Sequence, residues 1–206
     1  MNPFFSVIIP SFLGDYKNAA KDREAKLIRA IESVLKQTCQ DFEIIIIADG
    51  CEKTFELVCE KYKTQNNINC ILIKKQPLWT GAARQFGVTK ATGLWIAYLD
   101  SDDEFGPNHL QIIKDNVAER KWVWFNDYAK DKAGDIHERQ VNIEQKYHHG
   151  TSNFAHKKEC IITWGNGYGL DDFHAVQTLL RNNPGYAKIP TPEYYVCHIP
   201  AYRIDV

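Results

Sequence analysis

Carboxylates are concentrated in one short segment of the chain, residues 100–104, which reads Asp-Ser-Asp-Asp-Glu and directly follows an apolar run. Four acids in five residues repel one another unless a positive charge lies among them, and Mg²⁺ and Mn²⁺ prefer carboxylate oxygens as ligands. One interpretation is therefore a divalent metal site. The alternative is that Asp102 or Asp103 caps the helix expected after Pro107, or serves a solvated turn.

Other polar residues follow two further apolar runs: Pro10 and Ser11 follow the first, and Asp49 and Gly50 follow the second. In an open parallel sheet, ligands bind beyond the carboxyl ends of the strands, so these residues and the acidic segment are expected at one edge. The chain has no GxxxxGK[ST] motif and no GxGxxG after its first strand. A bound diphosphate would therefore depend on a metal and not on glycine amides.

Alternating strand and helix patterns predict how these residues are positioned. Short apolar runs bounded by polar or glycine residues predict strands, and 42–48 with its four isoleucines is typical of a strand buried on both faces. Right-handed crossovers between such strands give a mostly parallel sheet with helices on both faces, an α/β fold. The expected strands are 4–10, 42–48, 69–74 and 94–99, and the expected helices are 27–35, 55–62, 81–91 and one after 107.

The second half of the chain is less regular. We predict a strand over 121–128, a polar and irregular stretch over 131–158, and a helix over 171–182. A length of 206 residues allows one substantial core, so we predict a single domain over 1–206. Residues 1–115 would form its ligand-binding half and 116–206 the other wall of a cleft.

The composition excludes several classes of partner. Lysine and arginine number 25 against 26 aspartates and glutamates, so no overall field draws the protein to nucleic acid or to an anionic membrane. The six cysteines include no CxxC pair, which favours reduced, packing thiols over a zinc site. No signal peptide or apolar run of spanning length is visible, so we expect a cytoplasmic protein without a transmembrane segment.

Several segments, in order and spacing, resemble family 2 of the GT-A glycosyltransferases. The resemblance covers residues 4–115 and resumes at 169–172; two departures are Ala48, where the family commonly has Asp, and Gln85, where it has Asn. The matching segments are Phe5–Ser11 (opening strand), Ala30–Thr38 (first helix), Asp41–Ile44, Asp49-Gly50, Gly81–Gly87 (the family's segment of glycines around an arginine) and Leu99–Asp103 (the metal-binding DxD region).

The resemblance implies an inverting hexosyl or related transferase that moves a sugar from a nucleotide-diphosphate sugar to an acceptor hydroxyl, assisted by Mg²⁺ or Mn²⁺. By position, Asp49 would bind the nucleotide base in a pocket lined by Pro10 and Ser11. The acids of the DxD region would serve the ribose and the metal: Asp100, Asp102 and Asp103.

Three further residues have an implied role and a simpler alternative. Asp172 would be the catalytic base, or else only a carboxylate that favours a helix N-terminus. Arg84 would contact the donor, or else be a structural ion-pair partner of nearby acids. His198 would be a third metal ligand, or else a structural histidine.

The implied partners are a donor, with a UDP-sugar favoured, and a saccharide or lipid-linked saccharide acceptor in polysaccharide biosynthesis. Membrane contact would be peripheral. One rival interpretation is a non-catalytic nucleotide-sugar-binding relative, which would keep Asp49 and the acidic segment but need no base at Asp172. A second is a metal-dependent phosphatase or nucleotidyltransferase, although a phosphatase of the haloacid dehalogenase type would have DxDxT where this chain has Pro10-Ser11.

Overall fold

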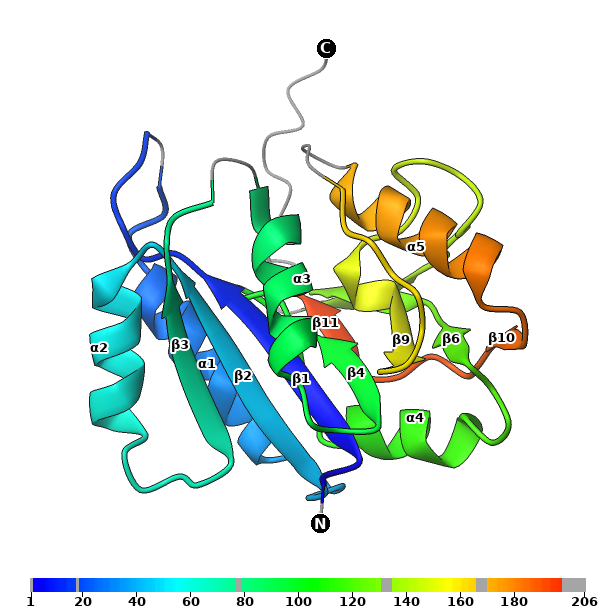
Figure 1. The fold of residues 1–206 in the computed structure, drawn as a ribbon, viewed down its shortest axis with the longest axis horizontal. Coiled ribbons are helices and arrows are strands. Elements are labelled where there is room, and N and C mark those ends of the chain that lie inside the picture. The colour runs from blue at the N-terminus through cyan, green and yellow to red at the C-terminus, as the bar shows by residue number, and fades with distance from the viewer. Residues whose placement is uncertain (1, 18, 77–78, 131–134, 166–169, 198–206) are drawn as a thin grey trace.

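A central sheet runs through the molecule (Figure 1). The computed structural model describes residues 2–17, 19–76, 79–130, 135–165 and 170–197. Within them the sheet has seven strands in the order β10-β6-β9-β4-β1-β2-β3. In that order the strands span Tyr186–Lys188, Trp122–Trp124, Phe154–Lys157, Trp95–Tyr98, Phe5–Ser11, Phe42–Asp49 and Ile68–Ile73.

Most pairs in this sheet are parallel. β1 pairs in parallel with β2 and β4, and β2 with β3, whereas β9 is antiparallel to both β4 and β6. Helices α1 (Arg23–Leu35), α2 (Glu52–Lys61) and α4 (His109–Asn116) pack on one face. Helices α3 (Trp79–Lys90) and α5 (Asp171–Asn182) pack on the other. The predicted mostly parallel sheet with helices on both faces is therefore confirmed.

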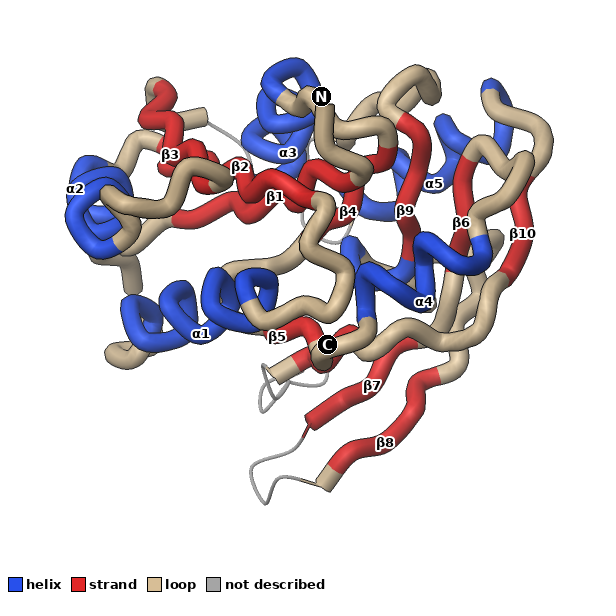
Figure 2. Tube along the Cα trace, turned by 90° about the horizontal axis from the view of Figure 1, so that it is seen from below, coloured by secondary structure: helices blue, strands red, loops and turns tan. Residues whose placement is uncertain are grey.

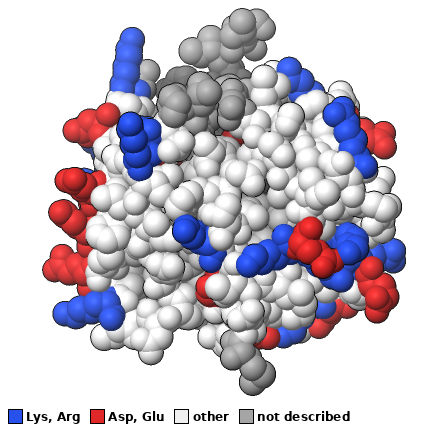
Figure 3. Space-filling view, in the orientation of Figure 1, with Lys and Arg blue, Asp and Glu red and all other residues white. Residues whose placement is uncertain are grey.

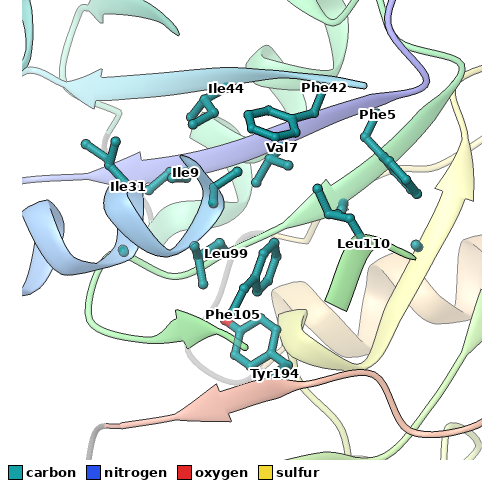
Figure 4. Close-up of a cluster of buried hydrophobic side chains, with 14 of the residues drawn as sticks. Phe5, Val7, Ile9, Ile31, Phe42, Ile44, Leu99, Phe105, Leu110 and Tyr194 are labelled. Carbon is teal, nitrogen blue, oxygen red and sulfur yellow. The ribbon is translucent and has the colours of Figure 1, made fainter. Parts of the chain in front are cut away.

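The isoleucines of β2 explain why this strand lies inside the sheet. Ile44 and Ile46 point into the core beneath α1, while Ile45 and Ile47 point into the core beneath α3 and α5. All of them are fully buried, as expected for a strand covered on both faces. Figure 4 shows the first of these cores, in which side chains of β1 and β2 meet those of the helices and Tyr194.

A second sheet lies beside α1 and corrects the expected strand over 121–128 (Figure 2). Its order is β5-β11-β7-β8, with bounds Glu104–Phe105, Tyr194–Val196, Asp127–Lys130 and Ile136–Arg139. The expected single strand is wrong because β6 ends at Trp124 in the central sheet and β7 begins at Asp127 in the second one. The stretch expected to be irregular also contains β8, the 3₁₀ helix η1 (Thr151–Asn153) and β9.

Charged side chains of both signs lie mainly around the rim of the face seen in Figure 3, which agrees with the near balance of charge in the sequence. None of the helices within the described ranges has the length and apolar character needed to cross a bilayer.

Buried histidines should make the fold sensitive to acid. His109 stacks on Phe105 with ring centroids 3.8 Å apart, and burial lowers its pKa to about 3. His156 lies 2.8 Å from the hydroxyl of Tyr98 through Nε2, and burial lowers its pKa to about 4. Both stay neutral in the folded protein between these values and about 6.5, where the unfolded chain binds protons. The contribution of these two histidines to the free energy of unfolding is therefore fully present above pH 6.5 and is lost as the pH falls below it.

Urea unfolding at pH 7.5 and at pH 5.0 measures this loss, which we expect to be about 2 kcal/mol for each histidine. The variant His109→Phe keeps an aromatic ring beside Phe105 but cannot titrate. Its loss between the two pH values should be smaller than that of the wild type by about 2 kcal/mol. An identical pH dependence in the two proteins would show that His109 is not a source of the acid sensitivity.

Candidate active site

Several of the predicted site residues lie where β1, β2 and β4 end, at the upper edge of the sheet in Figure 1. Ser11 is the last residue of β1, Asp49 is the last residue of β2, and Asp100 follows β4 by two positions. These parallel strands are adjacent in the order β4-β1-β2, so their carboxyl ends lie together. The topology thus brings together residues separated by up to about 90 positions in the sequence.

Asp49 is almost completely buried and both of its carboxylate oxygens accept hydrogen bonds. Lys75 Nζ donates to Oδ2 at 2.7 Å, and the backbone amide of Gln76 donates to Oδ1 at 2.8 Å. The ammonium group of Lys75 also lies 4.4 Å from the ring centroid of Phe12. Nearby, the buried hydroxyl of Ser11 has no hydrogen-bond partner among the described residues. An unpaired buried hydroxyl is costly, which is typical of a position that meets a ligand.

Arg84 is the centre of an ion-pair cluster. Its Nη2 lies 2.6 Å from Asp100 Oδ1, and its Nη1 lies 3.1 Å from Asp171 Oδ2 and 3.9 Å from Asp172 Oδ1. Only 4% of the side chain is exposed, and Cζ lies 5.0 Å from the ring centroid of Trp164. Burial acts to lower the pKa of Arg84, but the three carboxylates outweigh it and raise the pKa. The geometry favours the ion-pair alternative for this residue.

Two glycines allow α3 to carry Arg84 into this position. A Cβ on Gly81 would lie 2.5 Å from the carbonyl oxygen of Gly165 and 3.0 Å from Cβ of Asp171. A Cβ on Gly87 would lie 2.6 Å from Cγ2 of Ile8. Side chains at these positions would push α3 away from both β1 and the start of α5. The Gly81–Gly87 segment therefore sets the close approach that the cluster requires.

Asp172 lies in the first turn of α5 and is within reach of solvent, with 21% of its side chain exposed. Its Oδ1 accepts a hydrogen bond of 2.9 Å from the Thr151 hydroxyl. Burial raises the pKa of Asp172 to about 7; the charges of Asp171 and Asp100 act in the same direction, and Arg84 and Thr151 oppose them. A carboxylate whose pKa lies near neutrality is suited to act as a general base.

A known protein family matches most of the chain. The model of glycosyl transferase family 2 matches residues 6–172. The chain belongs to this family. Its central sheet corresponds to the predicted GT-A fold.

Two bacterial proteins are among the relatives of this chain. The putative colanic acid biosynthesis glycosyl transferase WcaA of Escherichia coli is 30% identical over 133 residues, which cover 62% of this chain and 44% of WcaA. The minor teichoic acid biosynthesis protein GgaA of Bacillus subtilis is 33% identical over 124 residues, covering 58% of this chain and 26% of GgaA. This chain thus spans less than half the length of these two relatives.

Among solved structures, the TarS 1–349 fragment from S. aureus in complex with UDP-GlcNAc superimposes with a TM-score of 0.75. The match covers 98% of this chain and 60% of that fragment, at 15% sequence identity. At this identity the likeness establishes the fold alone.

Asp102 and Asp103 of the acidic segment have different surroundings. Asp103 is buried, and its oxygens accept hydrogen bonds from the Tyr194 hydroxyl at 3.1 Å and from the Cys197 amide at 2.7 Å. Asp102 is half-buried, and its carbonyl oxygen accepts a hydrogen bond from Arg29. Across the described residues, no group of three or more His, Cys, Asp or Glu side chains is arranged to hold a metal. His198 lies outside the described residues, so its metal role stays a prediction.

Three contacts of the site were not anticipated from the sequence. Asp171 pairs with Arg84, Thr151 bonds the candidate base, and Lys75 bonds Asp49. Asp171 could have been found, because the family resemblance includes the whole Asp171-Asp172 pair. Thr151 and Lys75 carry no such signal, since neither belongs to a motif that matches the family.

Proposed function

We propose that this family 2 transferase is an inverting, metal-assisted enzyme that moves a sugar from a nucleotide-diphosphate sugar to an acceptor hydroxyl. The observation that carries the proposal is Asp172, a partly exposed carboxylate with its pKa raised to about 7, held at the sheet edge where the donor-site residues converge. A non-catalytic nucleotide-sugar-binding relative would have no need of such a carboxylate.

Asp172 acts on the acceptor. It takes the proton from the acceptor hydroxyl as the oxygen attacks the anomeric carbon from the side opposite the departing diphosphate, which inverts the configuration there. Thr151 fixes the orientation of the carboxylate through Oδ1. Arg84 offsets the charge of the neighbouring Asp100 and Asp171, so the acids can lie this close together.

Donor binding involves the ends of β1 and β2 and the acidic segment. Asp49 and Ser11, with Pro10 beside them, would line the base pocket. Asp102 with Asp100 has the hard oxygen donors that suit Mg²⁺ or Mn²⁺, with Asp103 as a further candidate ligand. The metal would supply positive charge to the departing diphosphate. These assignments place the donor on residues 1–115 and the acceptor against 116–206.

A UDP-sugar is the favoured donor. TarS, which has the same fold, was solved with UDP-GlcNAc and with UDP. GgaA and WcaA are named for teichoic acid and colanic acid biosynthesis. We therefore infer a saccharide or lipid-linked saccharide acceptor in cell-surface polysaccharide assembly, met by a cytoplasmic protein at most peripheral to the membrane.

Nucleotide binding tests this proposal directly. Thermal unfolding is followed with UDP, GDP, CMP and dTDP, each with Mn²⁺ or with EDTA. UDP with Mn²⁺ should raise the midpoint by roughly 5–10 °C at a hundredfold excess over its Kd. Asp102→Ala should lose the Mn²⁺-dependent part of the shift, whereas the control Asp115→Ala, at an exposed acid of α4, should keep it.

No Mn²⁺-dependent shift with any nucleotide would count against the proposed donor site. Normal donor binding together with no transfer and no donor hydrolysis would instead favour the non-catalytic relative.

A further inference from the structure

Arg139 of β8, like Arg84, pairs with a carboxylate, but its side chain is much more exposed to solvent. The Arg84 side chain is 4% exposed and is surrounded by three carboxylates. The Arg139 side chain is 45% exposed, and its carboxylate partner, Asp127 of β7, is completely buried. Asp127 and Arg139 face each other across the antiparallel pair of β7 and β8.

The contacts of Asp127 hold Arg139 in one orientation. Arg139 donates through Nε to Oδ1 at 2.7 Å and through Nη2 to Oδ2 at 2.5 Å. Oδ2 also accepts hydrogen bonds from Ser152 Oγ at 2.6 Å and from Asn153 Nδ2 at 3.0 Å. The carboxylate is thus fixed by four hydrogen bonds and cannot rotate without breaking them.

A guanidinium bound through Nε and Nη2 presents its other edge away from the carboxylate. That edge carries one hydrogen of Nη1 and the second hydrogen of Nη2, in the fork geometry that matches two oxygens of a phosphate. Within the described residues, no hydrogen bond from Nη1 is found. The pair therefore leaves a preoriented hydrogen-bond-donating edge on a half-exposed side chain.

The Asp127–Arg139 pair is linked to the candidate active site through a shared element. The short helix η1 contacts both parts, because Thr151 bonds Asp172 while Ser152 and Asn153 bond Asp127. Burial acts to lower the pKa of Arg139, but its bonds to Asp127 and then the charge of Asp103 raise it, so the guanidinium is within electrostatic reach of the acidic segment.

We propose that the outward edge of Arg139 binds a phosphate oxyanion during transfer. The charge balance supports this, because the acids of the site outnumber its cations and would repel an incoming diphosphate. Arg84 is already committed to its carboxylates, whereas Arg139 can add a partner without losing Asp127. The phosphate comes either from the donor diphosphate or from the acceptor. This inference rests on the proposed function.

Calorimetric binding of UDP, uridine, inorganic pyrophosphate and inorganic phosphate tests the inference. In Arg139→Gln, affinity for UDP and pyrophosphate should fall about 10- to 100-fold, with uridine unchanged, if the donor supplies the phosphate. If the acceptor supplies it, UDP should bind normally, and binding of inorganic phosphate to the UDP complex should be lost. Arg139→Lys keeps the charge but not the fork, so its affinities should lie between those of the wild type and Arg139→Gln. The control Arg181→Gln, at the exposed end of α5, should bind as the wild type does.

A second measurement needs no variant. Phenylglyoxal should modify the half-exposed Arg139 but not the buried Arg84, and pyrophosphate or UDP should protect Arg139, as read by peptide mass mapping.

The outcomes separate the two proposals. Normal UDP binding with no effect of Arg139→Gln on any anion, and no protection, would overturn the inference and leave the proposed function standing. Absence of UDP binding together with Arg139-dependent binding of pyrophosphate would overturn the proposed function and leave the phosphate site at Arg139 standing. If the wild type bound neither nucleotide nor anion, both would be overturned.

Discussion

Replacing Asp172 with asparagine should lower the rate of sugar transfer by about 10²- to 10⁴-fold while leaving the Kd for the donor unchanged. Asparagine has nearly the shape of aspartate and can still accept the hydrogen bond from Thr151, so the site should keep its geometry. It cannot take a proton at neutral pH. The change therefore removes the base and little else.

The measurement pairs initial rates of nucleotide release in the presence of acceptor with calorimetric Kd values for the donor. Asp115→Asn, at the exposed acid of α4, serves as the control and should transfer at the wild-type rate. Normal transfer by Asp172→Asn would rule out Asp172 as the base. A matched loss of donor affinity and rate would instead assign this residue to binding.

The pH profile of transfer should report the same carboxylate. Because the base acts when ionised and its pKa is about 7, the rate should fall about tenfold per pH unit below 7 and level off above it. The residual rate of Asp172→Asn should lack this step. Circular dichroism across the same pH range separates the step from acid unfolding, which the buried His109 and His156 should promote below pH 6.5.

The free energy of unfolding gives an independent check on Asp172, because its pH dependence is opposite to that caused by the buried histidines. The folded-state pKa of Asp172 lies above its value in the unfolded chain, so the folded state binds more protons between about 4 and 7 and loses stability as the pH rises through that window. Asparagine carries no charge to desolvate. The Asp172→Asn variant should therefore be more stable than the wild type at pH 8, which is the expected cost of keeping a catalytic carboxylate in a buried cluster.

The elements that hold the donor side could be predicted from local patterns. The four isoleucines of β2 required a strand covered on both faces, and the polar residues after β1, β2 and β4 had to meet at one edge once the strands were parallel. Helix α3 could also be predicted, because Gly81, Arg84 and Gly87 match a family segment and the two glycines allow the close approach of the helix.

The acceptor side depends on contacts that no local pattern contains. β9 has only Phe154–Lys157, and it is a strand because it inserts between β4 and β6, where His156 faces both Ile96 and Trp122. The carboxylate of Asp103 is bonded to Tyr194 and Cys197, more than 90 positions away. The pairing of Asp127 with Arg139 likewise follows from the β7–β8 register and from η1.

Replacing Arg84 with methionine should cost about 3–5 kcal/mol of folding free energy, the largest loss of stability that we expect from a single change in the site. Methionine fills much of the same volume beside Trp164 but leaves the buried Asp171 and the partly exposed Asp100 without their cation. Arg84→Lys should cost less, because it keeps a charge but cannot bridge both carboxylates. Urea unfolding at pH 7.5 measures each loss.

A double-mutant cycle then distinguishes the ion-pair role of Arg84 from a donor contact. If Arg84 mainly compensates the acids, adding Asp171→Asn to Arg84→Met should recover part of the stability, because one uncompensated charge is removed. A loss below about 1 kcal/mol in Arg84→Met, or no coupling in the cycle, would contradict this role. If a stable Arg84→Lys instead lost donor affinity with little change in unfolding, the guanidinium would have to leave its carboxylates to meet the donor. The cluster would then be a resting arrangement that opens on binding.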